Sequence, residues 1–298
     1  MTDTAPDHLN TVLTVILPAL DAEETIIDQL DALDDQEDPG VPWELVVVDN
    51  GSTDGTASIV DRYTSMRPSW RRVVADREPN LAYARNVGVR EAQGRYLAFC
   101  DADDVVAGDW AKAVVRALDQ DPLIAFAFEY ERLNDPHMLQ GRARFQSAAV
   151  ESFFGLPVAS GALGVHKAVW DAVGGNDERW SFSGEDYDFC LRVGRDLGIA
   201  PSFATHAVYH VRLRGDERDT FRQARRYGRS HVVLYSRYVT DRAPASERLG
   251  EAAVAWWWSV SRAPLALAEP SRRMRWARTA GVRAGRLAES LRQREFRP

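Results

Sequence analysis

The stretch GRYLAFCDADD, from Gly94 to Asp104, joins a predicted buried strand to a group of carboxylates. The residues before the first aspartate are nearly all apolar, whereas Asp101, Asp103 and Asp104 follow one another within four positions. Like charges this close repel, so a cation or bulk water must offset them. Carboxylate oxygens are the ligands that Mg²⁺ and Mn²⁺ prefer, which makes this strand end a candidate metal site. Capping of the next helix by Asp103 or Asp104 is the alternative.

The rest of the first half alternates short apolar runs with segments of helical spacing. Strands are predicted at 11–17, 44–49, 71–76 and 95–101, and helices at 24–33, at 81–94 and after the turn NGSTDGT, where Ser52 or Thr53 can cap the helix. This alternation predicts a mostly parallel sheet covered by helices. Ligands bind beyond the carboxyl ends of such strands, so we expect Pro18, Asp49 and residues 101–104 to meet on one rim.

Composition excludes several classes of protein. The 298 residues carry a net charge of −7, and such an acidic chain is a poor match for nucleic acid. Two cysteines, Cys100 and Cys190, give neither a disulfide framework nor metal-ligand spacing, which favours a reducing cytoplasm. The acidic start MTDTAPDHLN does not resemble a targeting peptide. No apolar run reaches the length of a membrane span, so we expect none.

The charge is unevenly distributed, because residues 241–298 contain 12 Arg but only six Asp and Glu, a balance of +6. Arginines at 272, 273, 275, 278, 283 and 286 alternate with apolar residues, as in a basic amphipathic helix, and the segment AVAWWWSV precedes them. Such a helix can lie on an anionic membrane, so 250–298 is a candidate peripheral membrane contact. The alternative is a helix that packs on the acidic body of the protein.

Four segments together resemble the inverting glycosyltransferases of family 2. They are VILPALDAEETI, ELVVVDNGSTDGT, LAYARNVGVREAQGRYLAFCDADD and GALGVHKAVWDAVGGNDERWSFSGEDYDFCLRVGRDLG, in this order within 11–212. The resemblance implies the GT-A fold, an α/β fold with a mixed, mostly parallel nucleotide-binding sheet flanked by helices. It also implies a domain over 11–240, with a nucleotide-binding half (11–120) and an acceptor-binding half (121–240), followed by a helical tail over 241–298.

The resemblance also assigns the residues that bind the donor nucleotide. They are Pro18, Asp21 and Glu23 after the first strand, Asp49 and Asn50 after the second, Arg85 near the diphosphate and Asp101 at the ribose. Asp21 stands where the family more often has Asn. Asp103 is implied as a ligand of Mn²⁺ or Mg²⁺, and Asp104 as a cap of the next helix. His210 is implied as a second metal ligand, with His206 as the alternative.

A second pair of acids lies in SGEDYDF. An inverting transfer needs a base for the acceptor hydroxyl, away from the leaving group. By resemblance Asp186 is this base, and Glu185 orients the acceptor or the donor sugar. The structural alternative is simpler, because acidic residues favour the first turn of any helix.

The expected function is transfer of a sugar from a nucleoside-diphosphate sugar, UDP-sugar first, to a hydroxyl of a saccharide or lipid-linked acceptor in cell-surface polysaccharide or glycolipid synthesis. QARRYG (223–228) has Tyr227 where processive family members have Trp, and no membrane span is expected, so we expect a single transfer per encounter. The alternatives are a sugar nucleotidyltransferase, although PALDAEET lacks the Gly-rich basic loop of that class, and a silent nucleotide-sugar binding module.

Overall fold

A computed structural model describes residues 11–139, 143–146, 148, 150–151, 157–159, 161–180, 183–239, 254, 256–257, 260–264 and 269–293. The strands are β1 (Leu13–Ala19), β2 (Trp43–Asp49), β3 (Trp70–Val74), β4 (Tyr96–Phe99), β5 (Val105–Val106), β6 (Leu123–Glu129), β7 (Val150–Glu151), β8 (Pro157–Val158), β9 (Leu163–His166) and β10 (Ser202–His210). The helices are α1 (Ile26–Asp34), α2 (Thr56–Ser65), α3 (Leu81–Glu91), α4 (Trp110–Leu118), α5 (Lys167–Ala172), α6 (Glu185–Leu197), α7 (Glu217–Tyr238) and α9 (Pro270–Arg292), with a 3₁₀ turn at Pro136–Leu139.

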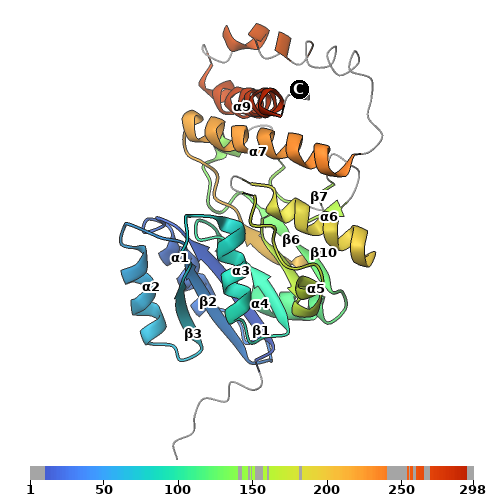
Figure 1. Cartoon of the computed structure of the whole chain (residues 1–298). Helices are drawn as coiled ribbons and strands as arrows, with labels where there is room; N and C mark the ends of the chain where they lie inside the picture. The colour runs from blue at the N-terminus through green and yellow to red at the C-terminus, as the bar shows by residue number, and fades with distance from the viewer. Residues whose placement is uncertain are drawn as a thin grey trace, which may run out of the picture. The chain divides into compact units, whose positions relative to one another are not determined.

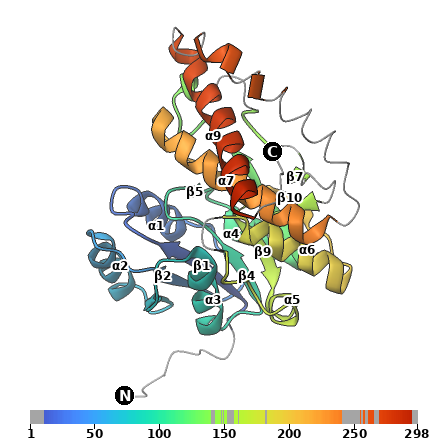
Figure 2. The same cartoon turned by 45° about the horizontal axis from the view of Figure 1, so that its top comes forward.

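The predicted parallel strands form one side of an eight-stranded sheet. Its order is β3-β2-β1-β4-β9-β6-β10-β5, and β1 pairs in parallel with β2 and β4 (Figures 1 and 2). The strand β9 runs antiparallel between β4 and β6, and β5 runs antiparallel to β10. The sheet is therefore mixed, as the family resemblance implied. Parallel strands put the ends of β1, β2 and β4 on one edge, and parallel β6 and β10 end together as well.

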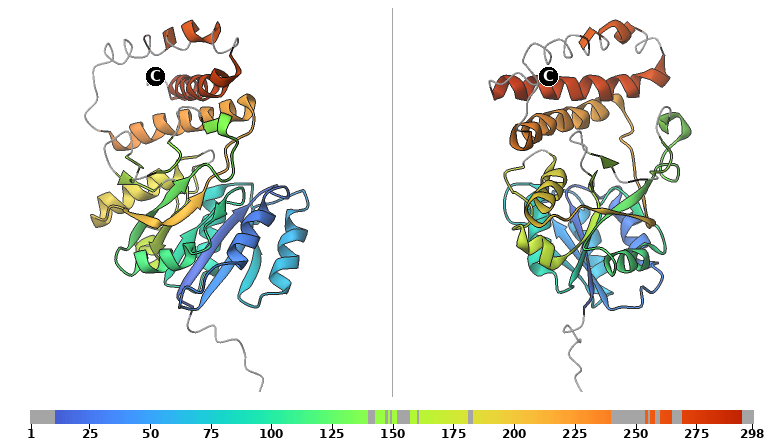
Figure 3. Two further views of the ribbon diagram at one scale, coloured as in Figure 1. Left: turned by 180° about the vertical axis from the view of Figure 1, so that it is seen from behind. Right: turned by 90° about the vertical axis from the view of Figure 1, so that its right-hand side faces the viewer.

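Strand β1 shows how the sequence builds a core on each face of this sheet. Leu13, Val15 and Leu17 are fully buried with side chains of α1, α2 and α4. Ile16 points the other way and is buried with side chains of α3, α5 and α6. Side chains alternate along a strand, so a continuous apolar run is the pattern expected of a sheet covered on both faces. Figure 3 shows helices on both faces.

Three local predictions were wrong. The first strand continues through Pro18 to Ala19, and Pro18 is paired with Val48 of β2. Neither Ser52 nor Thr53 caps α2, which begins at Thr56 after Gly55. The helix predicted at 81–94 ends at Glu91, because the backbone of the next residue, Ala92, is already extended (φ −69°, ψ 131°). A Cβ on Gly94 would come within 2.6 Å of the Thr14 nitrogen, so that position requires glycine.

The chain divides into two compact units. The first takes in the described parts of 1–133, 144–181 and 185–212, and the second those of 134–143, 182–184 and 213–298. The division thus falls after Arg212, so α7 groups with the tail, whereas the expected boundary was at 240.

Helix α9 packs on α7 within the second unit, where the two helices cross (Figures 1 and 2). Glycines make the crossing close: a Cβ on Gly228 would lie 2.0 Å from the Val282 carbonyl oxygen, and one on Gly285 2.1 Å from that of Arg225. Glu289 is almost fully buried there and pairs with Arg229. The amphipathic face of α9 is therefore at least partly used for packing. Within the described residues, every helix is too short or too polar to cross a bilayer.

Candidate active site

Two acids after β1 hold the turn that follows β2. Asp21 Oδ1 accepts hydrogen bonds from the Thr53 backbone N–H at 2.7 Å and from its hydroxyl at 3.2 Å. Glu23 Oε2 accepts from the Gly55 N–H at 2.7 Å. Asp21 has a φ of 46°, in the left-handed region that Asn and Asp tolerate better than most residues, which explains why a short polar residue stands here. Both side chains are exposed at the rim, and in this conformation their carboxylates order the loop before α2.

The end of β2 is more deeply buried. Asp49 accepts from the Ser52 N–H at 2.9 Å and pairs with Arg72 at 3.3 Å, and its exposed fraction is 6%. Asn50 is similarly buried, and its side-chain oxygen accepts from the Asn80 N–H at 3.3 Å. These residues lie at the carboxyl edge, as expected.

A buried arginine connects the two predicted acidic sites. Arg85 of α3 donates from Nη1 to Glu185 Oε1 at 3.0 Å, and from Nη2 to Asp101 Oδ1 at 3.2 Å and to the Gly161 carbonyl at 2.8 Å. Its side chain is only 3% exposed, whereas that of Asp101 is 32% exposed. The guanidinium therefore joins Asp101, after the end of β4, to Glu185 at the start of α6, although these two residues are 84 positions apart in the sequence (185 − 101).

The same glycine also holds Asp186. The Gly161 N–H donates to Asp186 Oδ2 at 2.5 Å, and the Tyr187 N–H donates to Oδ1 at 2.8 Å. Gly161 has a φ of +69°, which suits glycine, and a Cβ there would lie 3.5 Å from Asp101 Oδ2. The N–H group of Gly161 thus binds Asp186, and its carbonyl group binds Arg85.

Burial raises the pKa of both acids of this pair. For Glu185, burial and then the charge of Asp186 raise the pKa to about 7, and Arg85 opposes the rise. For Asp186, burial also raises the pKa, against Arg85 and the backbone N–H donors. A carboxylate with a raised pKa is a stronger base near neutral pH. By contrast, the buried thiols of Cys100 and Cys190 have pKa values raised by burial and are inert core groups.

The remaining aspartates lie beside the end of β10. Asp104 is buried and accepts from the Arg212 N–H at 2.6 Å, and Arg212 Nε donates to the Asp103 carbonyl at 2.9 Å. The expectation that Asp104 caps the next helix is wrong, because β5 intervenes and Asp109 precedes α4. His210 is paired with Val105 across the sheet, so it lies next to this loop. His206, the alternative ligand, is exposed four residues earlier.

The candidate metal ligands near β10 suit a cation that binds together with a nucleotide better than a cation held by protein side chains alone. Among the described residues, no three His, Cys, Asp or Glu side chains form a ready-made metal cage. Divalent ions that bind with a nucleotide usually take one or two protein ligands and complete their shell with phosphate oxygens and water. A carboxylate at Asp103 and an imidazole at His210 are a donor set of that size, and both suit Mn²⁺.

Sequence reasoning missed several residues that order this site. Gln29 of α1 is fully buried and its amide bonds the Asp101 carbonyl and the Val106 N–H, which fixes the loop between β4 and β5. Glu129 ends β6 and pairs with His210 Nδ1 at 2.6 Å. The signal for Glu129 was present, since LIAFAFE ends in an acid after a buried run, as β2 ends in Asp49.

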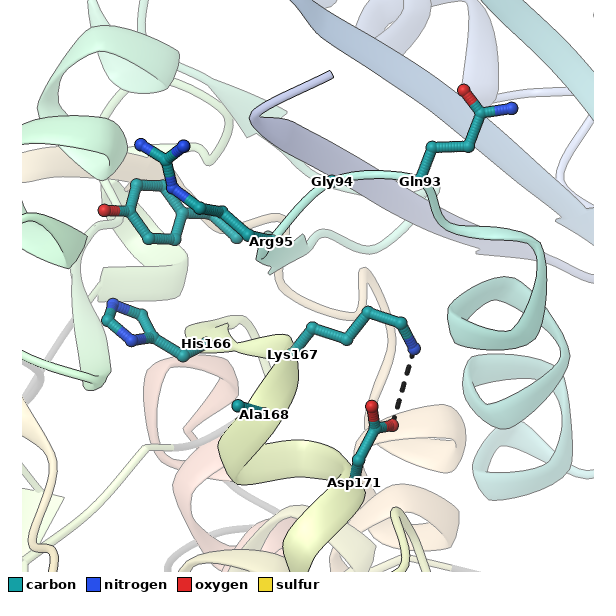
Figure 4. Close-up of a pocket in the computed structure, with 8 residues that line it drawn as sticks. Gln93, Gly94, Arg95, His166, Lys167, Ala168 and Asp171 are labelled. Atoms are coloured by element: carbon teal, nitrogen blue, oxygen red, sulfur yellow. Dashed lines mark hydrogen bonds and ion pairs between the residues drawn. The ribbon is translucent and has the colours of Figure 1, made fainter. Parts of the chain in front are cut away.

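A hollow of about 640 Å³ lies elsewhere in the first unit (Figure 4). Arg95, His166 and Lys167 line it, and Lys167 reaches Asp171 at 3.4 Å. Arg95 precedes β4, His166 ends β9 and Lys167 begins α5, so the hollow lies at the opposite end of β4 from Asp101. The hollow is therefore not part of the acidic site.

Comparison with solved structures identifies the class of fold. The mannosyltransferase PcManGT from Pyrobaculum calidifontis, in complex with GDP-Man and Mn²⁺, is similar over 96% of this chain and 89% of its own, with a TM-score of 0.63 and 22% identity. S. aureus TarS 1–349 with UDP is similar over 96% of this chain and 92% of its own, with a TM-score of 0.56 and 17% identity. The chain has the GT-A fold of such glycosyltransferases, which confirms the predicted fold class.

Sequence comparison then identifies the family. Residues 14–160 match the profile of glycosyl transferase family 2, and the chain belongs to that family through this region. The putative teichuronic acid biosynthesis glycosyltransferase TuaG of Bacillus subtilis is 38% identical over 93 residues, 31% of this chain and 36% of its own. The poly(ribitol-phosphate) beta-N-acetylglucosaminyltransferase TarS of Staphylococcus aureus is 33% identical over 110 residues, 36% of this chain and 19% of its own. The chain thus spans well under two thirds of these relatives.

Proposed function

We propose that the chain is an inverting glycosyltransferase that moves a sugar from a nucleoside-diphosphate sugar to an acceptor hydroxyl. One observation supports this most strongly: Arg85 joins Asp101, at the expected donor side, to Glu185, at the expected acceptor side. A sugar transfer needs the donor sugar and the acceptor hydroxyl within bonding distance, and the buried Arg85 guanidinium keeps the two acidic sites together.

In this proposal the rim residues hold the donor. Asp49 and Asn50 bind the base and ribose, with Asp101 at the ribose, and Pro18, Asp21 and Glu23 shape the loops around the nucleoside. Arg85 was expected to contact the diphosphate, but its Nη1 and Nη2 atoms donate to protein oxygens. We therefore assign it the role of holding Asp101 and Glu185 in place.

Asp103 and His210 are the proposed ligands of Mn²⁺ or Mg²⁺. When bound, such a cation neutralises the charge that develops on the departing nucleoside diphosphate, with no proton transfer.

Asp186 is the proposed general base. Two backbone N–H groups fix its carboxylate, and its raised pKa suits proton removal from an acceptor hydroxyl at neutral pH. Glu185, held by Arg85, orients the acceptor or the donor sugar beside it.

The donor and acceptor are proposed more broadly. The structural relatives carry GDP-Man in one case and UDP in another, so uridine and guanosine donors are both candidates, with UDP-sugar first. The named relatives point to cell-surface polymer synthesis and thus to a saccharide or lipid-linked acceptor. We infer one transfer per encounter.

A thermal-shift series tests the donor site. UDP, GDP and TDP are added with and without Mn²⁺ to the wild type and to Asp103→Ala. One nucleotide should stabilise the wild type in an Mn²⁺-dependent way, by about 2.7 kcal/mol at a hundred times its dissociation constant. The variant should lose the Mn²⁺-dependent part. The absence of a shift with every nucleotide would contradict the proposed function and favour a module without this activity. In a separate analysis of the reaction products, pyrophosphate would favour a nucleotidyltransferase.

We also propose a peripheral contact with anionic membrane through 250–298, at the inner face of the membrane. In the described part of this segment Val254, Trp257 and Val260 recur every three residues and are 57%, 62% and 68% exposed, and Arg272 and Arg273 of α9 are exposed too. Exposed Trp with nearby Arg is the composition of a helix that lies on a membrane surface. Residues 250–253, 255, 258–259, 265–268 and 294–298 of this segment lie outside the described residues.

The membrane contact has a simple test. The protein should float with vesicles that contain anionic lipid and stay behind with neutral ones, and Trp257→Ser should weaken flotation. Equal recovery with both kinds of vesicle, or none with either, would remove the proposal.

A further inference from the structure

A carboxylate at the end of β6 is bonded to the histidine proposed as a metal ligand. Glu129 and His210 are the last residues of parallel neighbouring strands and lie opposite each other in the register. Glu129 Oε2 is 2.6 Å from His210 Nδ1, and the two side chains are 17% and 12% exposed. The pair is therefore largely withdrawn from water.

Glu129 is itself held in place by the chain that follows it. The backbone N–H groups of Glu131 and Arg132 both donate to Oε1, the latter at 3.2 Å, and the Arg132 N–H also lies 3.3 Å from Oε2. These contacts fix the carboxylate independently of the imidazole. The hydrogen bond between the two side chains therefore orients His210 and not Glu129.

The hydrogen bond also decides where the histidine carries its proton. An ionised carboxylate only accepts, so Nδ1 must carry the hydrogen that lies between the two side chains. In the neutral ring Nε2 then has the free lone pair, which is the form that binds a metal. Histidines that bind metals commonly donate their other N–H to a carboxylate in this way.

The position of the ring completes the argument. His210 is paired with Val105, which lies two residues after Asp103. Arg212, two residues after His210, donates hydrogen bonds to the Asp104 side chain and to the Asp103 carbonyl. We propose that Glu129 is a positioning residue that holds His210 in the tautomer and orientation needed to bind the divalent cation beside Asp103. This inference rests on the proposed function.

Mn²⁺ binding to the full chain, with and without UDP or GDP, measures the role directly. Glu129→Leu should weaken Mn²⁺ affinity about 10- to 100-fold. Glu129→Gln keeps an oxygen that accepts from Nδ1, so its loss should be smaller. In a His210→Ala background, Glu129→Leu should cost nothing further, because Glu129 acts through His210. Glu131→Leu is the matched control, since Glu131 is exposed in the same loop.

Two results of the Mn²⁺ titration would overturn the proposal. An equal loss from Glu129→Leu with and without His210 would mean that Glu129 binds the cation by itself. An unchanged affinity in Glu129→Leu, with normal thermal stability, would mean that the pair serves only the fold.

Nitrogen NMR of histidine-labelled protein gives a readout that needs no metal. His210 should carry its hydrogen on Nδ1 in the wild type and move it to Nε2 in Glu129→Leu. A wild-type His210 with its hydrogen on Nε2 would overturn the proposal whatever the metal data show. If the tautomer is as expected but the wild type and Asp103→Ala both fail to bind Mn²⁺, the metal site of the proposed function fails, and the role of Glu129 in positioning His210 for a cation fails with it.

Discussion

Asp186→Asn is expected to lower sugar transfer by about 10²- to 10⁴-fold, the usual contribution of a general base, while donor binding stays within a few-fold of the wild type. Asn has the same shape but cannot take the proton of an acceptor hydroxyl. Each carboxylate oxygen of Asp186 accepts one backbone N–H, and Asn replaces one of these oxygens by an NH₂ group that cannot accept. A modest loss of stability should therefore accompany the loss of turnover.

Release of nucleoside diphosphate measures turnover in this experiment, and the nucleotide-dependent thermal shift measures donor binding. Asp196→Asn is the matched control, because Asp196 lies on the same helix but is exposed and pairs with its neighbour Arg195. Turnover above about a tenth of the wild type in folded Asp186→Asn would reject Asp186 as the base, since base removal costs at least about 10²-fold.

Arg85→Met is expected to cost about 3–5 kcal/mol of folding stability, because it leaves buried carboxylates without their cation. The loss should depend on pH in a defined direction. Burial and the Asp186 charge already raise the pKa of Glu185 from 4.5 to about 7, and removal of Arg85 takes away the charge that opposes this rise. A carboxyl whose folded pKa lies above its unfolded value loses stability as pH rises between the two values. The deficit of the variant should thus be small near pH 4.5 and grow through pH 7 and above.

Urea unfolding of Arg85→Met, Arg85→Lys and wild type at pH 5 and pH 8 measures this dependence. Lys keeps the charge but not the planar fork that reaches three oxygens, so it should recover part of the stability and little of the transfer. Arg90→Met is the control, because Arg90 is exposed on the same helix. A deficit in Arg85→Met that is equal at both pH values would show that the carboxylates are not what Arg85 stabilises.

The amino-acid sequence determined the elements and the family. Apolar runs that alternate with helical spacing predicted β1 to β4 and the helices between them, because strand burial on both faces and helix amphipathicity are properties of short segments. The four motifs gave the GT-A fold, which the structural comparison confirms. The donor, metal and base roles assigned to single residues stay predictions.

Only the tertiary structure decided how the acids are paired. Arg85 reaches Asp101 and Glu185 because α3, β4 and α6 converge, and the sequence separates the last two by more than 80 residues. Glu129 meets His210 only because β6 and β10 pair in parallel, and β9 enters the sheet antiparallel between β4 and β6. Such contacts depend on register and strand order, which are set by the packing of the whole sheet. Local sequence patterns fix which residues end a strand, but not which strand ends become neighbours.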